Sequence, residues 1–212
     1  MTDDLIERLV KDLRPIRGAG VAARLAGGLA AGALVALAGV LFILGLRPDM
    51  PAALGSAMFW VKLAYTVALA SLGAWCVERL ARPAGVPGRR LWWLVVPALA
   101  MIVLSGLQLA GAPADLRRPL VMGSSAMVCP WLILAVSAPV YAGLAWALRG
   151  LAPTRLRLTG ALAGLAAGGA GAAIYALHCP EAGAPFVAIW YSLGILAAAA
   201  SGALLGPRLL RW

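Results

Sequence analysis

Long apolar runs alternate with short polar links along most of this chain. Each run is about as long as the ~20 residues that an α-helix needs to cross the hydrocarbon core of a bilayer. The pattern therefore predicts an all-α, polytopic membrane protein with six transmembrane helices within residues 23–212. The predicted spans are approximately 24–46, 57–77, 91–110, 120–148, 158–177 and 186–205.

Residues 1–22 follow a different pattern, in which apolar and charged positions alternate with a helical period. Thr2 is a typical N-cap, and Pro15 ends the helix that Thr2 begins. At about 100° per residue, the apolar side chains fall on one face of this helix and the charged side chains on the other. The apolar face consists of Leu5, Ile6, Leu9, Val10 and Leu13.

This short amphipathic helix is marginal in water, because isolated helices below about 12–15 residues rarely hold together. We therefore predict that residues 1–22 form a cytosolic segment that folds against a partner protein. Two other interpretations stay open: the helix could lie on the bilayer surface or on its own membrane domain. Its mixed charges differ from the Lys/Arg-rich polar face of a purely lipid-binding helix. We expect no cleavable signal peptide, since the segment has neither a basic n-region nor a small-residue cleavage site.

Positive charge is distributed unevenly between the two sides of the predicted membrane domain. Three links carry only Arg47, Arg117 and Arg118, whereas the termini and the other two links carry most of the arginines. Cytoplasmic loops are the ones enriched in Lys and Arg, so both termini are predicted to be cytoplasmic. This distribution also accounts for the net charge of +10 without a nucleic-acid partner. The cations on the basic side are Arg8, Lys11, Arg14, Arg17, Arg24, Arg79, Arg82, Arg89, Arg90, Arg149, Arg155, Arg157, Arg208 and Arg211.

The composition agrees with a membrane protein and adds a packing hypothesis. The chain is 63% hydrophobic and 12% charged, whereas soluble domains average about 45–50% and about 25%. Gly28/Gly32 and Gly160/Gly164/Gly168 recur at a four-residue spacing, which lets membrane helices approach closely. The alternative is that these glycines only reflect a general bias towards small residues.

Few ionisable residues lie inside the predicted spans, where such a residue is a functional candidate by default. Lys62 lies near the outer end of the second span, from which it can snorkel to the interface. Glu78 and Arg79 mark the inner boundary of the same span. The sequence contains no proton relay across the midplane, no P-loop and no catalytic triad. We therefore expect neither an enzyme nor a proton-coupled transporter, and no resident cofactor.

The three cysteines differ in their expected surroundings. Cys76 lies near the inner end of the second span and is interpreted as a buried structural thiol. Cys179 lies in the fifth link, on the predicted outer and oxidising side. A helix that began at Leu120 would place Cys129 about 14 Å below the surface. A helix of ~20 residues that ended at Arg149 would place Cys129 at the outer rim instead, where it could meet Cys179.

Both outer cysteines are followed by a proline, Pro130 and Pro180. Proline removes a backbone donor and bends a helix, so each thiol is expected at a mechanical weak point. His178 could lower the pKa of Cys179 or act as a co-ligand for a soft metal. The residues alone leave two interpretations of Cys129 and Cys179: a redox-sensing or metal-sensing pair, and structural thiols.

Taken together, these features resemble the NrsF family. The chain opens with Thr-Asp-Asp-Leu-Ile-x-x-Leu at 2–9, continues with Asp-Leu-x-Pro-Ile at 12–16, and carries a late Cys-Pro and a His-Cys-Pro-Glu at 178–181. Members of the family are membrane-bound anti-sigma factors for extracytoplasmic-function sigma factors of the sigma-F type. The resemblance covers nearly the whole chain.

The resemblance implies that the N-terminal segment holds the sigma factor at the bacterial inner membrane. It also implies that outward-facing cysteines, here Cys129 and Cys179, take part in sensing heavy-metal or oxidative stress. On this hypothesis the apolar face of the N-terminal helix binds the sigma factor as a helix in a groove. One rival is a membrane thiol–quinone oxidoreductase, which needs a second reactive dithiol or a bound quinone. The other rival is a small-molecule transporter, which needs a polar cavity.

Overall fold

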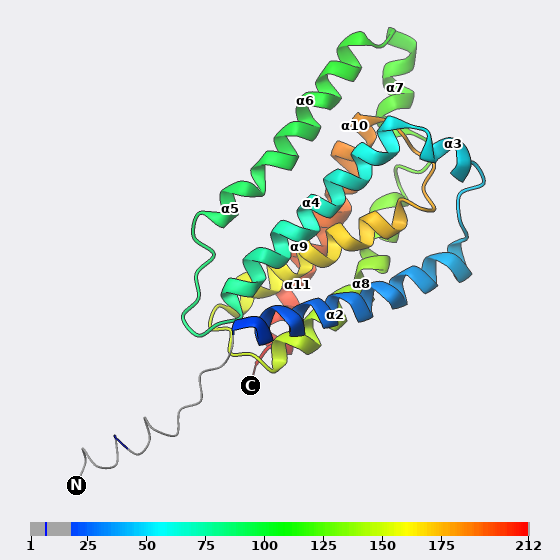
Figure 1. Ribbon diagram of the computed structural model, residues 1–212. Coiled ribbons are helices and arrows are strands. Elements are labelled where there is room, and N and C mark those ends of the chain that lie inside the picture. The colour runs from blue at the N-terminus through cyan, green and yellow to red at the C-terminus, as the bar shows by residue number, and fades with distance from the viewer. Residues whose placement is uncertain (1–6, 8–17, 212) are drawn as a thin grey trace.

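The computed structural model describes Glu7 and residues 18–211, and this part of the chain is helical and contains no strand (Figure 1). The all-α class predicted from the sequence is therefore confirmed for these residues. The longer helices are α2 (Gly18–Gly39), α4 (Ala57–Leu80), α6 (Val95–Gly111), α8 (Cys129–Arg149), α9 (Leu156–Tyr175) and α11 (Ser192–Leu209). The shorter elements are α3 (Met50–Leu54), α5 (Arg90–Trp93), α7 (Ala114–Met122), α10 (Ala184–Phe186) and the π-helical segments η1 (Val40–Leu44) and η2 (Val187–Tyr191).

Six helical stretches in the described residues are long and apolar enough to cross a membrane. The shortest has 20 residues, which corresponds to about 30 Å of helix and thus to the thickness of a bilayer core. The six helices predicted from the hydrophobic pattern are present. The stretches are Gly20–Leu44, Ala57–Leu80, Arg90–Gly111, Cys129–Arg149, Leu156–Tyr175 and Ala184–Leu209.

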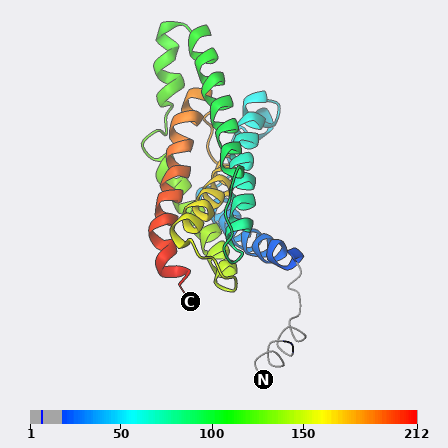
Figure 2. The ribbon, with the colours of Figure 1, turned by 90° about the vertical axis from the view of Figure 1, so that its left-hand side faces the viewer.

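Helix α9 lies in the middle of the bundle, where it packs against α4, α8 and α11 (Figure 1, Figure 2). In its most apolar part, 67% of the residues are buried inside the protein, against 11% for the α5–α6 stretch. Helices α5 and α6 stand at one edge of the bundle and leave most of their apolar side chains exposed.

The two described ends of the chain lie at the same end of the bundle (Figure 1). We call this the terminal end, and it contains the start of α2, the links after α4 and α8, and the end of α11. We call the opposite end the cysteine end. It contains the links between α2 and α4, between α6 and α8, and between α9 and α10.

Glycine lets α9 and α11 approach until their backbones touch. A Cβ on Gly160 would overlap the carbonyl oxygen of Gly202, and a Cβ on Gly164 would overlap that of Ala198. Gly168 faces Ile195 one turn further along. The packing interpretation of the four-residue spacing is therefore confirmed for this helix pair.

Helices α2 and α8 are packed in the same way. Gly28 lies against the carbonyl of Gly143, and Gly32 lies against the backbone of Pro139 and Val140. The proline inside α8 leaves the helix unbroken from Cys129 to Arg149. The small residues of the first predicted span thus also serve helix packing.

The predicted fourth span, 120–148, needs a correction. Helix α7 ends at Met122, turns follow, and α8 begins only at Cys129. Gly123 has φ +50°, a left-handed conformation in which the helix cannot continue. Pro130 lies in the first turn of α8, where its missing N–H costs nothing. Residues 120–128 therefore do not belong to the spanning helix.

The predicted N-terminal helix and its apolar face (Leu5, Ile6, Leu9, Val10 and Leu13) lie outside the described residues. The end of the first span lies within them, and it differs slightly from the prediction of Leu46. The helix ends at Leu44, because Gly45 has φ +79° and leaves the helical conformation.

Candidate thiol site

The structure brings Cys129 and Cys179 together at the cysteine end of the bundle. Cys129 is the first residue of α8, and Cys179 lies in the link between α9 and α10. Both side chains are 0% exposed, both thiols are free, and the two side chains hydrogen-bond to each other. The sequence allowed Cys129 to lie either deep within a helix or at its outer rim, and the structure has it at the start of the helix.

The neighbouring prolines place the thiols at helix ends and not at bends within helices. The backbone N–H of Cys129 donates to the Ser125 carbonyl, and that of Cys179 donates to the Tyr175 carbonyl, at 2.9 and 3.0 Å. Pro130 then starts α8, and Pro180 follows the last turn after α9. Each thiol is thus held by a helical turn on one side, and the bending expected from the Cys-Pro pairs is absent here.

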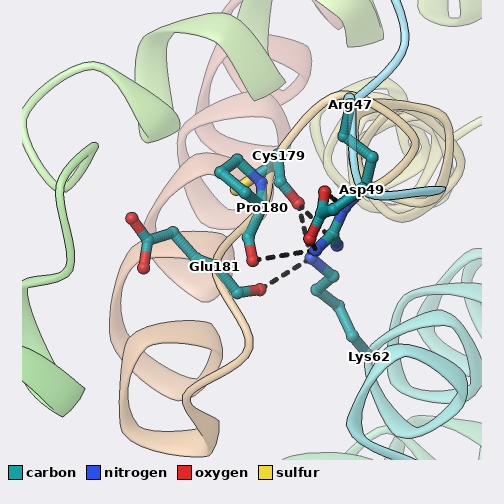
Figure 3. Close-up of polar contacts among 6 residues, drawn as sticks. All are labelled: Arg47, Asp49, Lys62, Cys179, Pro180 and Glu181. Atoms are coloured by element: carbon teal, nitrogen blue, oxygen red, sulfur yellow. Dashed lines mark hydrogen bonds and ion pairs between the residues drawn. The ribbon is translucent and has the colours of Figure 1, made fainter. Parts of the chain in front are cut away.

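Lys62 is a buried cation that reaches the Cys179 segment from α4 (Figure 3). Its Nζ donates to the carbonyl oxygens of Cys179 and Glu181, at 3.1 and 2.9 Å. The ammonium also lies 5.3 Å from the centre of the Tyr191 ring, close enough for a cation–π contact. The residue is 1% exposed. The expectation that Lys62 snorkels to the interface is therefore wrong, because two carbonyls and an aromatic ring inside the protein surround its ammonium.

Arg47 is a second buried cation and comes from the link between α2 and α3. Its guanidinium donates to the carbonyl oxygens of Cys179 and Pro180, at 3.3 and 3.2 Å. It also forms a two-pronged ion pair with Asp49, with N···O distances of 2.7 and 2.6 Å. This pairing raises the pKa of Arg47 and lowers the pKa of Asp49, because each charge stabilises the other. Figure 3 shows both cations directed at the same backbone segment.

The carboxylate of Glu181 connects the two cysteine segments. Its Oε1 accepts hydrogen bonds from the backbone N–H and the hydroxyl of Ser124, both at 2.7 Å. Ser124 lies in the turns that lead into Cys129, and Glu181 follows Cys179 by two residues. The Glu181 carboxylate thus ties the two cysteine segments together.

Aromatic side chains close the site against water. Tyr175, Phe186 and Tyr191 are at most 2% exposed and belong to the same apolar cluster as the two cysteines. The Tyr191 hydroxyl lies beside the Cys179 thiol, and it has no oxygen or nitrogen partner among the described residues. The polar neighbour of the Tyr191 hydroxyl is therefore the sulfur of Cys179.

The two thiols differ in acidity because their surroundings differ. The hydrogen bond with Cys129 lowers the pKa of Cys179, burial opposes this by raising it, and the Lys62 ammonium lowers it further. The net effect is a pKa of Cys179 below its ordinary value. These surroundings favour the thiolate form of Cys179, which is the form that binds a metal or acts as a nucleophile.

The donor set offers two soft sulfur ligands and no complete tetrahedral site among the described residues. Among the described residues, no group of three or more His, Cys, Asp and Glu side chains is placed to hold a metal. The Nδ1 atom of His178 lies 2.9 Å from the Gly45 carbonyl, and the Glu181 carboxylate is bound to Ser124. The co-ligand role of His178 stays a prediction. Structural zinc needs four such ligands, whereas two thiols supply the kind of ligand that a soft metal ion prefers.

Comparison with known proteins adds to this geometry. The NrsF family model, described as negative regulator of sigma F, matches residues 9–212. The chain belongs to the NrsF family. A probable anti-sigma-F factor NrsF of Azospira oryzae is 40% identical over 215 residues, covering 100% of this chain and 99% of that protein. The anti-sigma-F factor NrsF of Caulobacter vibrioides is 41% identical over 213 residues, with the same coverage. No solved structure matches the chain.

In this member of the NrsF family, the sequence did not predict that two cations, Arg47 and Lys62, contact the Cys179 segment. Arg47 was counted only as a topology signal, and Lys62, although noted as an ionisable residue within a span, was expected to snorkel to the interface. Each is a cation within or beside a span on the side that carries few cations. An ionisable residue in such a place is a functional candidate, and this signal identifies both without a structure.

Proposed function

We propose that this chain is a membrane-bound anti-sigma factor of the bacterial inner membrane. It holds a cytosolic extracytoplasmic-function sigma factor of the sigma-F type through its N-terminal segment. It releases the sigma factor when Cys129 and Cys179 capture a soft heavy-metal ion or become oxidised. The observation that carries this proposal is the match of nearly the whole chain to the NrsF family. The pairing of two free thiols at the end of the bundle remote from the start of α2 supports the sensing role.

Membrane insertion with both termini in the cytoplasm is supported by where charged and aromatic side chains lie. The described cations of the terminal end outnumber those of the cysteine end, as the positive-inside rule requires of a cytoplasmic face. Exposed tryptophans lie near both ends of the spans, where headgroups favour them. Trp60 and Trp131 lie at the cysteine end, and Trp92, Trp93 and Trp146 at the terminal end.

Two chemical events at the thiol pair are compatible with release. A soft divalent cation binds both sulfurs as thiolates, and each thiol that was protonated gives up its proton to water. Alternatively, a peroxide oxidises the two thiols to a disulfide, and the peroxide is reduced to two molecules of water. Either event replaces a weak thiol–thiol hydrogen bond by a fixed sulfur geometry. The signal can shift the protein only by its difference in affinity for the two states.

Sigma-factor capture is tested by the substitution Leu9→Asp in the full-length chain. A charge in the middle of the apolar face would have to be buried in the sigma factor, which costs several kcal/mol without a partner charge. We expect the amount of co-purified sigma factor to fall at least tenfold. The control is Lys11→Asp, which adds the same side chain on the charged face and should leave capture within about twofold of the wild type.

The wild-type chain and both variants are purified from membranes at equal yield before sigma factor is compared. Undiminished co-purification with Leu9→Asp would show that this face does not bind the sigma factor. An equal loss with Lys11→Asp would assign the effect to charge and not to the apolar face.

A further inference from the structure

We infer that α2 carries the signal from the thiol pair to the N-terminal segment, with Arg47 as the positioning residue that ties the Cys179 segment to this helix. The inference rests on the proposed function and adds to it a path across the membrane domain. Of the helices tied to the thiol site, α2 is the one that continues directly into residues 1–17.

Four hydrogen bonds connect the chain just after η1 to the segment around Cys179. The Arg47 backbone N–H donates to the Leu177 carbonyl at 3.0 Å, and the Gly45 carbonyl faces Nδ1 of His178 at 2.9 Å. The Arg47 guanidinium adds its bonds to the carbonyls of Cys179 and Pro180. Arg47 therefore contacts the backbone before and after the Cys179 side chain, and Figure 3 shows its contacts with Cys179 and Pro180.

The ion pair with Asp49 fixes the guanidinium in this position. Both oxygens of the carboxylate are used, and the Arg47 side chain is 6% exposed. A guanidinium held by two parallel bonds has little freedom to follow a moving carbonyl. A shift of the Cys179 segment must therefore either break these bonds or move Arg47 and the end of α2 with it.

Helix α2 is suited to pass such a displacement along its length. Its 22 residues correspond to about 33 Å of helix, and its backbone bonds are internal to the helix. Its main packing partner is α8, the helix that begins with the other cysteine. At Gly28 and Gly32 the backbones of the two helices meet directly, and near the terminal end Arg24 donates to the Ala147 carbonyl. Packed helices of this kind move against each other by small shear displacements.

The segment η1 is a place where the helix can change between a π-helical and an α-helical turn. It is π-helical, and the N–H of Gly45 donates to the Val40 carbonyl at 2.8 Å. Single π-helical turns occur mostly as bulges in α-helices and are frequent at functional sites. Return of this turn to α-helix would rotate and shift the part of α2 before it relative to Arg47.

The chemistry at the thiols supplies the displacement. A disulfide holds its two sulfurs about 2.05 Å apart, much closer than two hydrogen-bonded thiols. Cys129 is fixed at the start of α8, whereas Cys179 lies in a link. Closing this gap therefore pulls the Cys179 segment, and Arg47 with it, relative to α8.

The test uses the reciprocity of linked binding: if Cd²⁺ weakens sigma-factor binding, the bound sigma factor weakens Cd²⁺ binding by the same factor. Full-length protein in nanodiscs is titrated with Cd²⁺, with and without its sigma factor, and protection of Cys129 and Cys179 from a maleimide is measured. For the wild type we expect the two midpoints to differ by about tenfold. For Arg47→Met, which removes all donors of the guanidinium, we expect the ratio to fall towards one. The control Arg117→Met changes an exposed arginine at the same end and should keep the wild-type ratio.

The outcomes separate this inference from the proposed function. If the Cd²⁺ midpoints with and without sigma factor differ as much in Arg47→Met as in the wild type, the inference is overturned and the proposed function stands. Absence of any Cd²⁺ protection or coupling in the wild type contradicts metal sensing itself. If Cd²⁺ protects Cys129 and Cys179 from the maleimide in the wild type but not in Arg47→Met, then Arg47 takes part in metal capture. That result would also overturn its coupling role. If Arg47→Met does not accumulate in membranes, Arg47→Lys replaces it: a reduced ratio supports the inference, and an unchanged ratio contradicts it.

Discussion

Lys62 and Arg47 show how two buried cations are accommodated in an apolar protein without a buried carboxylate for each. Backbone carbonyls of residues 179–181 accept from both side chains. Hydrogen bonds from charged donors contribute about 1.5–3 kcal/mol each, which offsets part of the cost of removing the charges from water. The carbonyls are available because Pro180 and the turn after α9 take them out of the helical ladder.

The thiols themselves are tested by replacing Cys129 and Cys179 with serine, singly and together. Serine keeps the size of the side chain but is a hard, weak ligand and cannot form a disulfide. We expect Cd²⁺-induced release of the sigma factor to need at least tenfold more Cd²⁺, with normal capture in its absence. The measurement is the amount of sigma factor retained on purified membranes across a Cd²⁺ titration.

Cys76→Ser is the matched control, since Cys76 is equally buried but lies in the other apolar cluster. It should respond as the wild type does. A double serine variant that still releases the sigma factor at the wild-type Cd²⁺ concentration would rule out the thiol pair as the sensor.

At the scale of single residues, the sequence identified Cys129 and Cys179 as candidates but not what surrounds them. The sequence left Cys129 either inside a helix that begins at Leu120 or at the outer rim of a shorter helix. Gly123, which ends α7, and Pro130, which starts α8, decide for the rim. The positive φ of Gly123 is a backbone property that no residue pattern prescribes, because glycine adopts either sign of φ.

The length of the apolar runs predicts the helices, whereas the residues on each helix surface decide how the helices pack. Their number and approximate bounds follow from apolar runs, because backbone hydrogen bonds inside a helix are local and need no partner element. Which faces meet depends on small residues at a four-residue spacing, as in the pairs α9–α11 and α2–α8. The sequence contains that spacing, but it does not name the partner helix.

Adjacent glycines of α2 allow a direct test of this packing. A Cβ on Gly28 would overlap the Gly143 carbonyl, whereas Gly27 has no atom within 4 Å of such a Cβ. Overpacking of this kind costs about 1–3 kcal/mol. We therefore expect Gly28→Ala to lower the thermal unfolding midpoint in detergent and Gly27→Ala to leave it unchanged or slightly raised. Equal midpoints for the two variants would contradict the close approach of α2 and α8.

The whole molecule has two chemically different ends. Described cations gather at the terminal end, and the thiol site lies at the other. The terminal end carries Arg24, Arg79, Arg82, Arg89, Arg90, Arg149, Arg155, Arg157, Arg208 and Arg211, and the cysteine end carries Arg47, Lys62, Arg117 and Arg118. In the proposed topology, a signal on the outer side of the inner membrane meets the thiols while the partner protein stays in the cytoplasm.

The proposed topology predicts the side on which an added cysteine reacts in intact cells. Arg117→Cys and Arg155→Cys place exposed thiols at the cysteine end and the terminal end, respectively. After outer-membrane permeabilisation, we expect a membrane-impermeant maleimide to label Arg117→Cys at once. Arg155→Cys should react only after the inner membrane is opened. Both variants are made in a chain whose free thiols, Cys76, Cys129 and Cys179, are replaced by serine, so that only the added cysteine reacts. The reverse labelling order would invert the topology.

The sequence by itself determined the class of the protein, the six helices and the two candidate thiols, because helix formation and apolar length are local properties of the chain. Only the tertiary structure decided that Lys62 is buried, that Arg47 binds the Cys179 segment, and that the two thiols touch. The contacts of Lys62 and Arg47 with Cys179 join residues separated by 117 and 132 positions, respectively. They depend on how the helices are tilted and rotated against one another, and this is set by packing over the whole bundle.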